Sequence, residues 1–288
     1  MKQLNLFIEL IRINKPIGYM LLFWPCAWGL TLAYDFSNNP KLYLFYLMLF
    51  FFGAVLMRSA GCIVNDIFDR KFDAKVSRTK NRPIASGKVS VITAIIYSAV
   101  LCLLALTVLL NFNKFTILIA LGSMPLAFSY PLMKRFTYWP QLFLGITFNY
   151  GIILGWTSIN PSVGILPALV YLGAIFWTLG YDTIYGFQDL KDDEIIGVKS
   201  TSLMFRKNPY RFLYFCYFIF ILSLVLLGMV SNMNFFYYFL LILISFQMFY
   251  LQIKKLNINN AQSCLRIFKS NNFLGIIIFF TLIIGKIN

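Results

Sequence analysis

The chain has 288 residues, of which 60% are hydrophobic and 12% are charged, and its mean hydropathy is +0.75. This composition is typical of polytopic membrane proteins and excludes an ordinary soluble domain. The net charge of +15 does not indicate nucleic-acid binding, because the basic residues are spread among short connections between apolar runs and form no single stripe.

Nine apolar runs approach the length of about 20 residues that a membrane-spanning helix needs. Their approximate limits are 17–35, 42–63, 89–110, 115–133, 140–159, 163–185, 211–230, 235–252 and 272–286. Pro125 and Pro131 predict that the fourth run is kinked or short. We therefore expect an all-α polytopic membrane protein, with residues 1–288 forming a single domain.

Lysine and arginine gather on one side of the expected bundle. Of the 25 basic residues, all but Lys41, Lys114 and Lys286 lie before the first run or in and beside the second, fourth, sixth and eighth connections. Because positively charged loops stay in the cytoplasm, we expect a multi-pass protein of the bacterial inner membrane whose N-terminus is inside. No cleavable signal is recognisable, so the N-terminus is expected to be retained.

An acidic motif follows the second run. Asn65, Asp69 and Asp73 are spaced at i, i+4 and i+8, so on a helix their oxygens line one face, with Asp66 beside them. Carboxylates this close repel one another and stay ionised only if positive charge lies among them. Oxygen ligands without cysteine or histidine suit Mg²⁺, which also binds substrate phosphates. The motif therefore predicts a magnesium-diphosphate site at a membrane face.

The alternative is a solvated polar loop in which the aspartates pair with Arg70, Lys71 and Lys75. The connection after the motif, residues 78–87, is similarly ambiguous: it is either an ordinary positively charged linker or a cap that binds phosphate.

A second acidic cluster ends the sixth run. Asp182 and Asp189 are seven residues apart and Asp189 and Asp193 are four apart, so all three can share a helical face, with Asp192 adjacent. Two clusters on the same side of the membrane could hold two or three Mg²⁺ ions around a diphosphate and stabilise its departure from carbon. The nearby cations that could neutralise the remaining oxygens are Arg70, Lys71, Arg78, Arg82, Lys134 and Arg135.

These motifs resemble the UbiA family of membrane prenyltransferases, which carry an N-D-x-x-D-x-x-x-D motif and a second aspartate motif like residues 181–193. The match covers nearly the whole chain. Within the family, the resemblance is greatest to the enzymes that prenylate 4-hydroxybenzoate. It rests on residues 12–18 with 21–25, 81–87, 130–141 and 181–185.

The resemblance implies nine helices around a central cavity, with the aspartates below a cytoplasmic cap and the isoprenoid tail in a lateral opening to lipid. It assigns the first magnesium-diphosphate set to Asn65, Asp66, Asp69 and Asp73, and the second to Asp182, Asp189, Asp192 and Asp193. It also places Ser129, Tyr130 and Lys134 near the diphosphate. The implied reaction is Mg²⁺-dependent transfer of a polyprenyl group from polyprenyl diphosphate to the ring carbon ortho to the hydroxyl of 4-hydroxybenzoate, in ubiquinone biosynthesis.

The carboxylate of such an acceptor needs a counter-ion. Arg12, Lys15 and Arg58 are the cations nearest membrane depth, and each could instead extend to the lipid headgroups. Arg12, in the family-like opening motif, is the residue we select.

Two rival hypotheses remain at this point. The first is a member of the same family with another aromatic acceptor. The second is a divalent-cation transporter, although a transporter should place acidic residues along the depth of the bilayer, whereas these gather at one face.

Overall fold

The computed structural model describes residues 2–75 and 79–287, apart from the side chains of Lys2, Lys191, Asp192 and Ile196. Every regular element in this part of the chain is helical. In chain order the elements are α1 (Lys2–Ile11), α2 (Ile17–Ala33), α3 (Pro40–Asp73), α4 (Val91–Leu109), α5 (Lys114–Gly122), α6 (Met124–Phe136), α7 (Pro140–Asn149), α8 (Gly151–Thr157), α9 (Ile165–Gly186), η1 (Phe187–Asp189), α10 (Leu190–Ile196), α11 (Thr201–Met204), α12 (Pro209–Val230), α13 (Phe235–Phe246), the π-helical η2 (Gln247–Lys254) and α14 (Ala261–Lys286).

The predicted all-α membrane architecture is confirmed. Among the described residues, seven helical segments are long and apolar enough to cross a membrane. The first predicted run forms the shorter α2, and the fifth is divided at Tyr150 into α7 and α8. The count of nine spans therefore stays a prediction.

Helix boundaries differ from the predicted runs where charged residues continue a helix. α3 extends ten residues past the predicted end at Ile63, so the first acidic motif is helical. α14 begins at Ala261, eleven residues before the predicted start, because the Asn260 side chain accepts hydrogen bonds from the first backbone amides. The predicted break in the fourth run is confirmed, since α5 and α6 meet at Ser123, just before Pro125.

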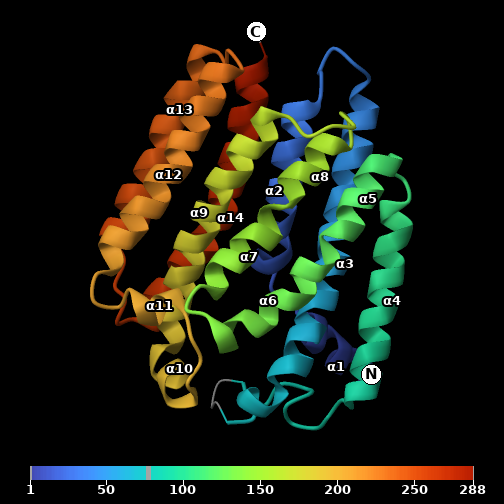
Figure 1. Cartoon of the computed structure of the whole chain (residues 1–288), viewed down its shortest axis with the longest axis vertical. Coiled ribbons are helices and arrows are strands. Elements are labelled where there is room, and N and C mark those ends of the chain that lie inside the picture. The colour runs from blue at the N-terminus through green and yellow to red at the C-terminus, as the bar shows by residue number, and fades with distance from the viewer. Residues whose placement is uncertain (1, 76–78, 288) are drawn as a thin grey trace.

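The long helices lie side by side in a bundle (Figure 1), with α12 and α13 on one side and α4 on the other. The end that carries α1 and α10 also holds the connection between α3 and α4, whereas residue 287 lies at the opposite end. Both acidic motifs are therefore brought to the same end of the bundle.

An aromatic core joins α2, α9 and α12. The Trp28 and Trp177 ring centroids are 5.1 Å apart, and the Phe220 ring stacks on Trp177 at 5.7 Å. Both indole N–H groups are satisfied by α14: Trp177 donates to Asn271 Oδ1 and Trp28 to the Gly275 carbonyl. Such ring pairs contribute about 0.5–1.5 kcal/mol each beyond their buried area, and none of these three rings lines the large cavity described below.

α2 and α8 approach each other closely through glycine. A Cβ atom on Gly29 would lie 2.0 Å from the Ile152 carbonyl oxygen, and one on Gly155 would lie 2.2 Å from the Cys26 carbonyl oxygen. Small residues allow this kind of backbone approach between membrane helices. The obstructing atoms are backbone atoms, so they cannot rotate away.

The C-terminal end of α2 is held by α14. Lys286 Nζ donates hydrogen bonds to the carbonyl oxygens of Thr31, Leu32 and Tyr34, at 3.0, 2.9 and 2.5 Å. These carbonyls lack partners within the helix, and a cation is favoured at a helix C-terminus.

Gly155→Ala is expected to lower the free energy of unfolding by about 2 kcal/mol or more, because the added methyl overpacks a backbone contact. The measurement is thermal unfolding in a lipid-like detergent. Gly122→Ala is the matched control, since a Cβ at that position has no atom within 4 Å apart from those of its chain neighbours and its own helix backbone. Equal melting temperatures for the two variants would contradict the close approach.

Candidate functional site

The first acidic motif occupies the last turns of α3. Asp66, Asp69 and Asp73 are 2%, 3% and 8% exposed, so they do not form a solvated loop. Asn65 Nδ2 donates to Asp69 Oδ2 at 3.1 Å, which confirms the predicted i, i+4 neighbours on one face. Three carboxylates buried this closely require positive charge among them.

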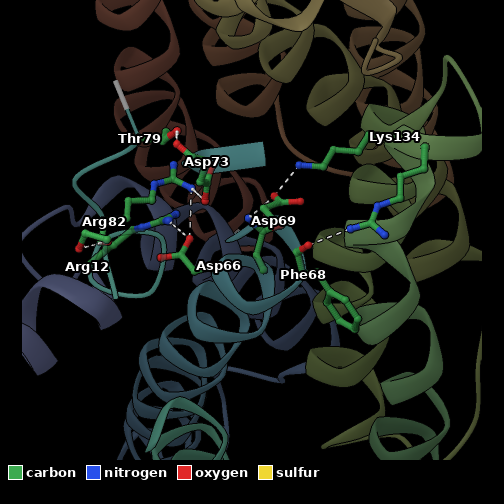
Figure 2. Close-up of polar contacts among 11 residues, drawn as sticks. Arg12, Asp66, Phe68, Asp69, Asp73, Thr79, Arg82 and Lys134 are labelled. Atoms are coloured by element: carbon green, nitrogen blue, oxygen red, sulfur yellow. Dashed lines mark hydrogen bonds and ion pairs between the residues drawn. The ribbon is translucent and has the colours of Figure 1, made fainter. Parts of the chain in front are cut away.

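Three cations from separate segments supply that charge (Figure 2). Arg82, in the connection between α3 and α4, donates from Nη1 to Asp73 at 2.8 Å and to Asp66 at 3.2 Å. Arg12, between α1 and α2, also pairs with Asp66, and Lys134 of α6 pairs with Asp69. These partners are not the Arg70, Lys71 and Lys75 of the polar-loop alternative.

Arg12 reaches Asp66 from an unusual backbone conformation. Its φ of +54° lies in the left-handed region, which costs a non-glycine residue about 1–2 kcal/mol. Burial lowers the pKa of this guanidinium, but Asp66, Cys62 and Tyr185 together more than offset that effect, and the pKa lies above its ordinary value. Arg12 is thus held against the motif in this structure, and its role as the acceptor counter-ion stays a prediction.

Asp69 differs from its neighbours in one oxygen. Oδ2 accepts hydrogen bonds from Asn65 and Lys134, whereas Oδ1 is buried with no hydrogen-bond partner in the part of the chain that the structure describes. A buried carboxylate oxygen without a donor is costly unless a ligand or cation completes it.

The second acidic cluster is not on one continuous helix. α9 ends at Gly186 and the 3₁₀ turn η1 intervenes before α10, so the predicted ladder is interrupted. A Cβ on Gly186 would lie 2.2 Å from Ser202 Oγ, which shows how closely α11 packs against this end of α9. Asp182, Asp189 and Asp193 nevertheless all line the cavity described next, whereas the side chain of Asp192 is not among those described.

One cavity of about 990 Å³ joins the two clusters. Its lining includes Asn65, the three aspartates of α3 and the three described aspartates of the second cluster, with Arg12, Arg58, Arg82, Tyr130 and Lys134. Beyond this polar end the lining continues along apolar residues of α3, α4 and α6. The cavity thus has a charged end and an apolar remainder.

The aspartates are not arranged as a complete set of metal ligands in this structure. Among the described side chains, no three acidic or cysteine groups lie closely enough to enclose a metal ion. The reason is visible in the ion pairs, because each carboxylate of α3 faces a lysine or arginine instead of another carboxylate. The all-oxygen donor set and the unpartnered Asp69 Oδ1 suit a hard divalent cation, provided that it replaces these side chains.

Several residues selected from the sequence lie away from the cavity lining. Ser129 Oγ donates to the Leu126 carbonyl of its own helix at 3.2 Å. Arg70 is exposed and donates to Ile67, and Arg135 donates to the Phe68 carbonyl and lies over the Phe72 ring. None of the three lines the cavity, and Arg78 lies outside the described residues.

Sequence reasoning missed two residues on the cavity wall. Thr79 is 4% exposed and donates from Oγ1 to the Asp73 carbonyl, which joins the connection after α3 to the helix end. Lys199 also lines the cavity, and its backbone N–H donates to the Lys134 carbonyl at 2.9 Å. Lys199 could have been found, because it lies in the basic segment directly after the second cluster, just as Arg82 follows the first.

Arg58 lines the cavity, and Gly18 leaves space for its side chain. A Cβ on Gly18 would lie 2.7 Å from Arg58 Nε, so the absence of a side chain at Gly18 makes room for the guanidinium. The guanidinium carbon is 5.5 Å from the Phe148 ring centroid. Unlike Arg12 and Arg82, Arg58 has no carboxylate salt bridge among the described residues.

Comparison with known proteins gives consistent matches. The model of the UbiA prenyltransferase family matches residues 22–281. The mitochondrial 4-hydroxybenzoate polyprenyltransferases of Bos taurus and Homo sapiens are 43% and 42% identical to the chain, each over 99% of it and 76% of the relative.

Solved structures share the fold. A UbiA homologue from Aeropyrum pernix K1 superposes with a TM-score of 0.73 at 21% identity, covering 94% of this chain and 99% of that one. A UbiA homologue from Archaeoglobus fulgidus, bound to GPP and Mg²⁺, gives a TM-score of 0.72 at 18% identity, covering 96% and 99%.

The relatives correct the expected location. Eight curated relatives with 40–43% identity, from mammals, flies, a nematode and a plant, are all mitochondrial proteins. The expectation of a bacterial inner membrane, with the site on its cytoplasmic side, is therefore wrong. The loop-charge rule concerns which way a bundle faces, not the membrane that holds it, so the conclusion that stands is a multi-pass membrane protein.

The ion pairs predict how the site binds a divalent cation by itself. Arg82→Gln removes a charge that competes for Asp66 and Asp73, so the affinity for Mg²⁺ alone should rise about tenfold, equivalent to about 1.4 kcal/mol. Isothermal titration of the purified protein with Mg²⁺, without any diphosphate, measures this change.

Arg206→Gln is the matched control, because Arg206 pairs with Glu194 at an exposed position that does not line the cavity. An unchanged or weakened Mg²⁺ affinity in Arg82→Gln would contradict the competition between Arg82 and the metal.

Proposed function

Because the chain belongs to the UbiA prenyltransferase family, we propose that it is a 4-hydroxybenzoate polyprenyltransferase. It would transfer a polyprenyl group from polyprenyl diphosphate to the ring carbon ortho to the acceptor hydroxyl and release diphosphate, in ubiquinone biosynthesis. The observation that carries the proposal is the single cavity in which buried aspartates and cations meet at one end and apolar side chains continue beyond them. The 4-hydroxybenzoate acceptor is supported by the relatives at 43% and 42% identity.

The aspartates form the proposed metal site. Mg²⁺, held by Asp66, Asp69 and Asp73 with Asp182, Asp189, Asp192 and Asp193, would act as a Lewis acid that stabilises the departing diphosphate. Use of a divalent metal is supported by UbiA homologues solved with Mg²⁺ or with Cd²⁺.

The cations bound to the aspartates have a second role in this proposal. With metal held by their carboxylate partners, Arg12, Arg82 and Lys134 would be available to donate charge-assisted hydrogen bonds to the diphosphate oxygens. Lys134 is on α6 and Arg82 is between α3 and α4, and they lie on different sides of the aspartates (Figure 2).

The acceptor carboxylate would bind Arg58. In this proposal Arg58 takes the acceptor role in place of Arg12, because Arg12 is assigned to the diphosphate while Arg58 lines the cavity with no carboxylate salt bridge among the described residues. The guanidinium lies over the Phe148 ring at a distance where a cation and an aromatic face attract each other. The acceptor ring would then lie between Arg58 and the diphosphate.

The reaction is an electrophilic aromatic substitution. The carbon–oxygen bond to diphosphate breaks with its electron pair leaving on oxygen, the ortho carbon forms the new carbon–carbon bond, and the ring releases its proton. The developing allylic cation must be shielded from water, and aromatic faces stabilise it. Tyr130 of α6 and Tyr185 of α9 line the cavity that also holds the aspartates, and they are candidates for this role.

An acceptor panel tests this function. Purified protein in lipid, with Mg²⁺ and a polyprenyl diphosphate, should prenylate 4-hydroxybenzoate and lose activity when the metal is chelated. Product from a naphthoate or homogentisate but none from 4-hydroxybenzoate would favour the rival acceptor class. Mg²⁺ uptake into proteoliposomes that prenyl diphosphate does not alter would favour the transporter hypothesis.

The aspartates should be needed for turnover and not for folding. Asp69→Asn and Asp193→Asn are expected to lower kcat/KM by about 100-fold or more, because each removes charge that stabilises the transition state. Prenyl transfer and melting temperature should be measured together. Glu194→Gln, next to Asp193 but exposed and outside the cavity, should stay near the wild-type rate. Near-normal turnover in both aspartate variants would refute a two-cluster site.

A further inference from the structure

The last third of the chain carries positive charge that no acidic side chain of its own offsets. None of residues 195–288 is aspartate or glutamate, whereas nine of them are lysine or arginine. Three of these cations, Arg211, Lys254 and Lys255, are exposed where α12 begins and η2 ends. None of the three has a carboxylate salt bridge among the described residues. Their charge is therefore available to an anionic ligand.

The π-helical η2 brings two of these cations to one aromatic ring. Lys254 Nζ is 4.9 Å from the Tyr250 ring centroid, and Lys255 Nζ is 5.7 Å from it. A π-helix closes its hydrogen bonds five residues apart instead of four, so Lys255 as well as Lys254 reaches the ring. Two ammonium groups beside one ring repel each other, and an anion bound between them removes that repulsion.

A buried polar network fixes η2 to its neighbours. Gln252 is 1% exposed, and its Oε1 accepts a hydrogen bond from the Tyr217 hydroxyl of α12 at 2.6 Å. Its Nε2 donates to Asn271 Oδ1 of α14 and to Gln247 Oε1, each at 3.2 Å. Because hydrogen bonds of this kind hold the inner face of η2 on two other helices, its outer face keeps a constant position.

The start of α12 completes the exposed surface. The Tyr210 hydroxyl donates to the Leu256 carbonyl at 3.1 Å, and the Tyr214 ring stacks on Phe249 with the centroids 5.8 Å apart. Arg211 lies between these two tyrosines on the same helix and is exposed. We call this surface the cationic patch; its residues are Tyr210, Arg211, Tyr214, Tyr250, Lys254 and Lys255. None of them lines the cavity.

An apolar surface continues from the cationic patch toward the opposite end of the bundle. Further along α12, Phe218 is 58% exposed, and on α13 Phe239 and Phe246 are 51% and 54% exposed. These two helices lie together at one side of the bundle (Figure 1). Tyrosine is enriched at the boundary between the hydrocarbon and the headgroups of a membrane. The tyrosines therefore place the cations of the patch at headgroup level, with apolar rings at the depth of the acyl chains.

We propose that the cationic patch binds an anionic phospholipid. Its headgroup phosphate lies among Arg211, Lys254 and Lys255, and its acyl chains lie along α12 and α13. Basic surfaces at the ends of membrane helices recognise anionic headgroups. A soluble phosphate matches only the charged part of this surface and leaves the apolar part without a partner. The site is separate from the cavity, so the inference does not depend on the proposed prenyl transfer.

A variant that removes two charges tests the proposal. Lys254→Gln with Lys255→Gln keeps the length of both exposed side chains, and the affinity for phosphatidylglycerol should fall about tenfold or more. Arg211→Gln should weaken the same affinity from the α12 side. The full-length protein in a neutral detergent is titrated with phosphatidylglycerol or phosphatidylcholine, and native mass spectrometry measures the bound lipid. The rise in melting temperature with each lipid provides a second readout.

Lys80→Gln with Lys88→Gln is the matched control. Both lysines are exposed in the connection between α3 and α4, and neither lines the cavity. This variant removes the same charge from the same end of the bundle but away from α12 and η2, so it should bind phosphatidylglycerol like the wild type.

The expected result is a wild-type preference for phosphatidylglycerol over phosphatidylcholine that only the patch variants lose. An equal loss in the control variant would show a response to net charge alone and overturn the site. Equal affinities of the wild type for the two lipids would also overturn it. Glycerol 3-phosphate that stabilises the protein as much as phosphatidylglycerol does would identify a soluble phosphate as the ligand and refute the lipid.

Discussion

The structure depends most on the neutralisation of three buried carboxylates at the end of one membrane helix. An isolated buried charge costs several kcal/mol, and removing one partner of a buried pair costs about 3–5 kcal/mol. Asp66, Asp69 and Asp73 obtain their counter-charges from the turn after α1, from the connection before α4 and from α6. The need for charge balance therefore helps to position three separate segments at this end of the bundle.

The two halves of the bundle serve different purposes. α2, α9, α12 and α14 are joined by stacked tryptophan and phenylalanine rings whose N–H groups are satisfied, so this half is rigid. α3, α4 and α6 instead leave space between them and line the cavity. α2 and α8 meet through Gly29 and Gly155 and connect the halves. A rigid half of this kind can hold α9, and with it Asp182, in a constant position while side-chain partners change at the end of α3.

The helical period of the sequence predicted some features of the acidic site correctly and could not predict others. The face shared by Asn65 and Asp69 was predictable because a helix repeats every 3.6 residues. The cations on that face were not, because Arg12 and Lys134 are 54 and 65 residues from their partners and only the tertiary fold selects them. The prediction that Asp182, Asp189 and Asp193 share one helical face was wrong, because a 3₁₀ turn follows Gly186 and shifts the helical phase. Ser202 packs against Gly186 at this point. Ser129 illustrates a further limit, since a hydroxyl near a motif can bond to its own helix.

The contact of Lys286 with the end of α2 has a consequence for biosynthesis. α2 is shorter than the other membrane-spanning segments, and three of its terminal carbonyls are satisfied by a side chain more than 250 residues later in the chain. A ribosome makes α2 early and residue 286 late. During synthesis those carbonyls must rely on water or lipid headgroups, and the bundle closes between its early and late helices only when α14 has entered the membrane. Completion of the fold is thus coupled to completion of this last helix.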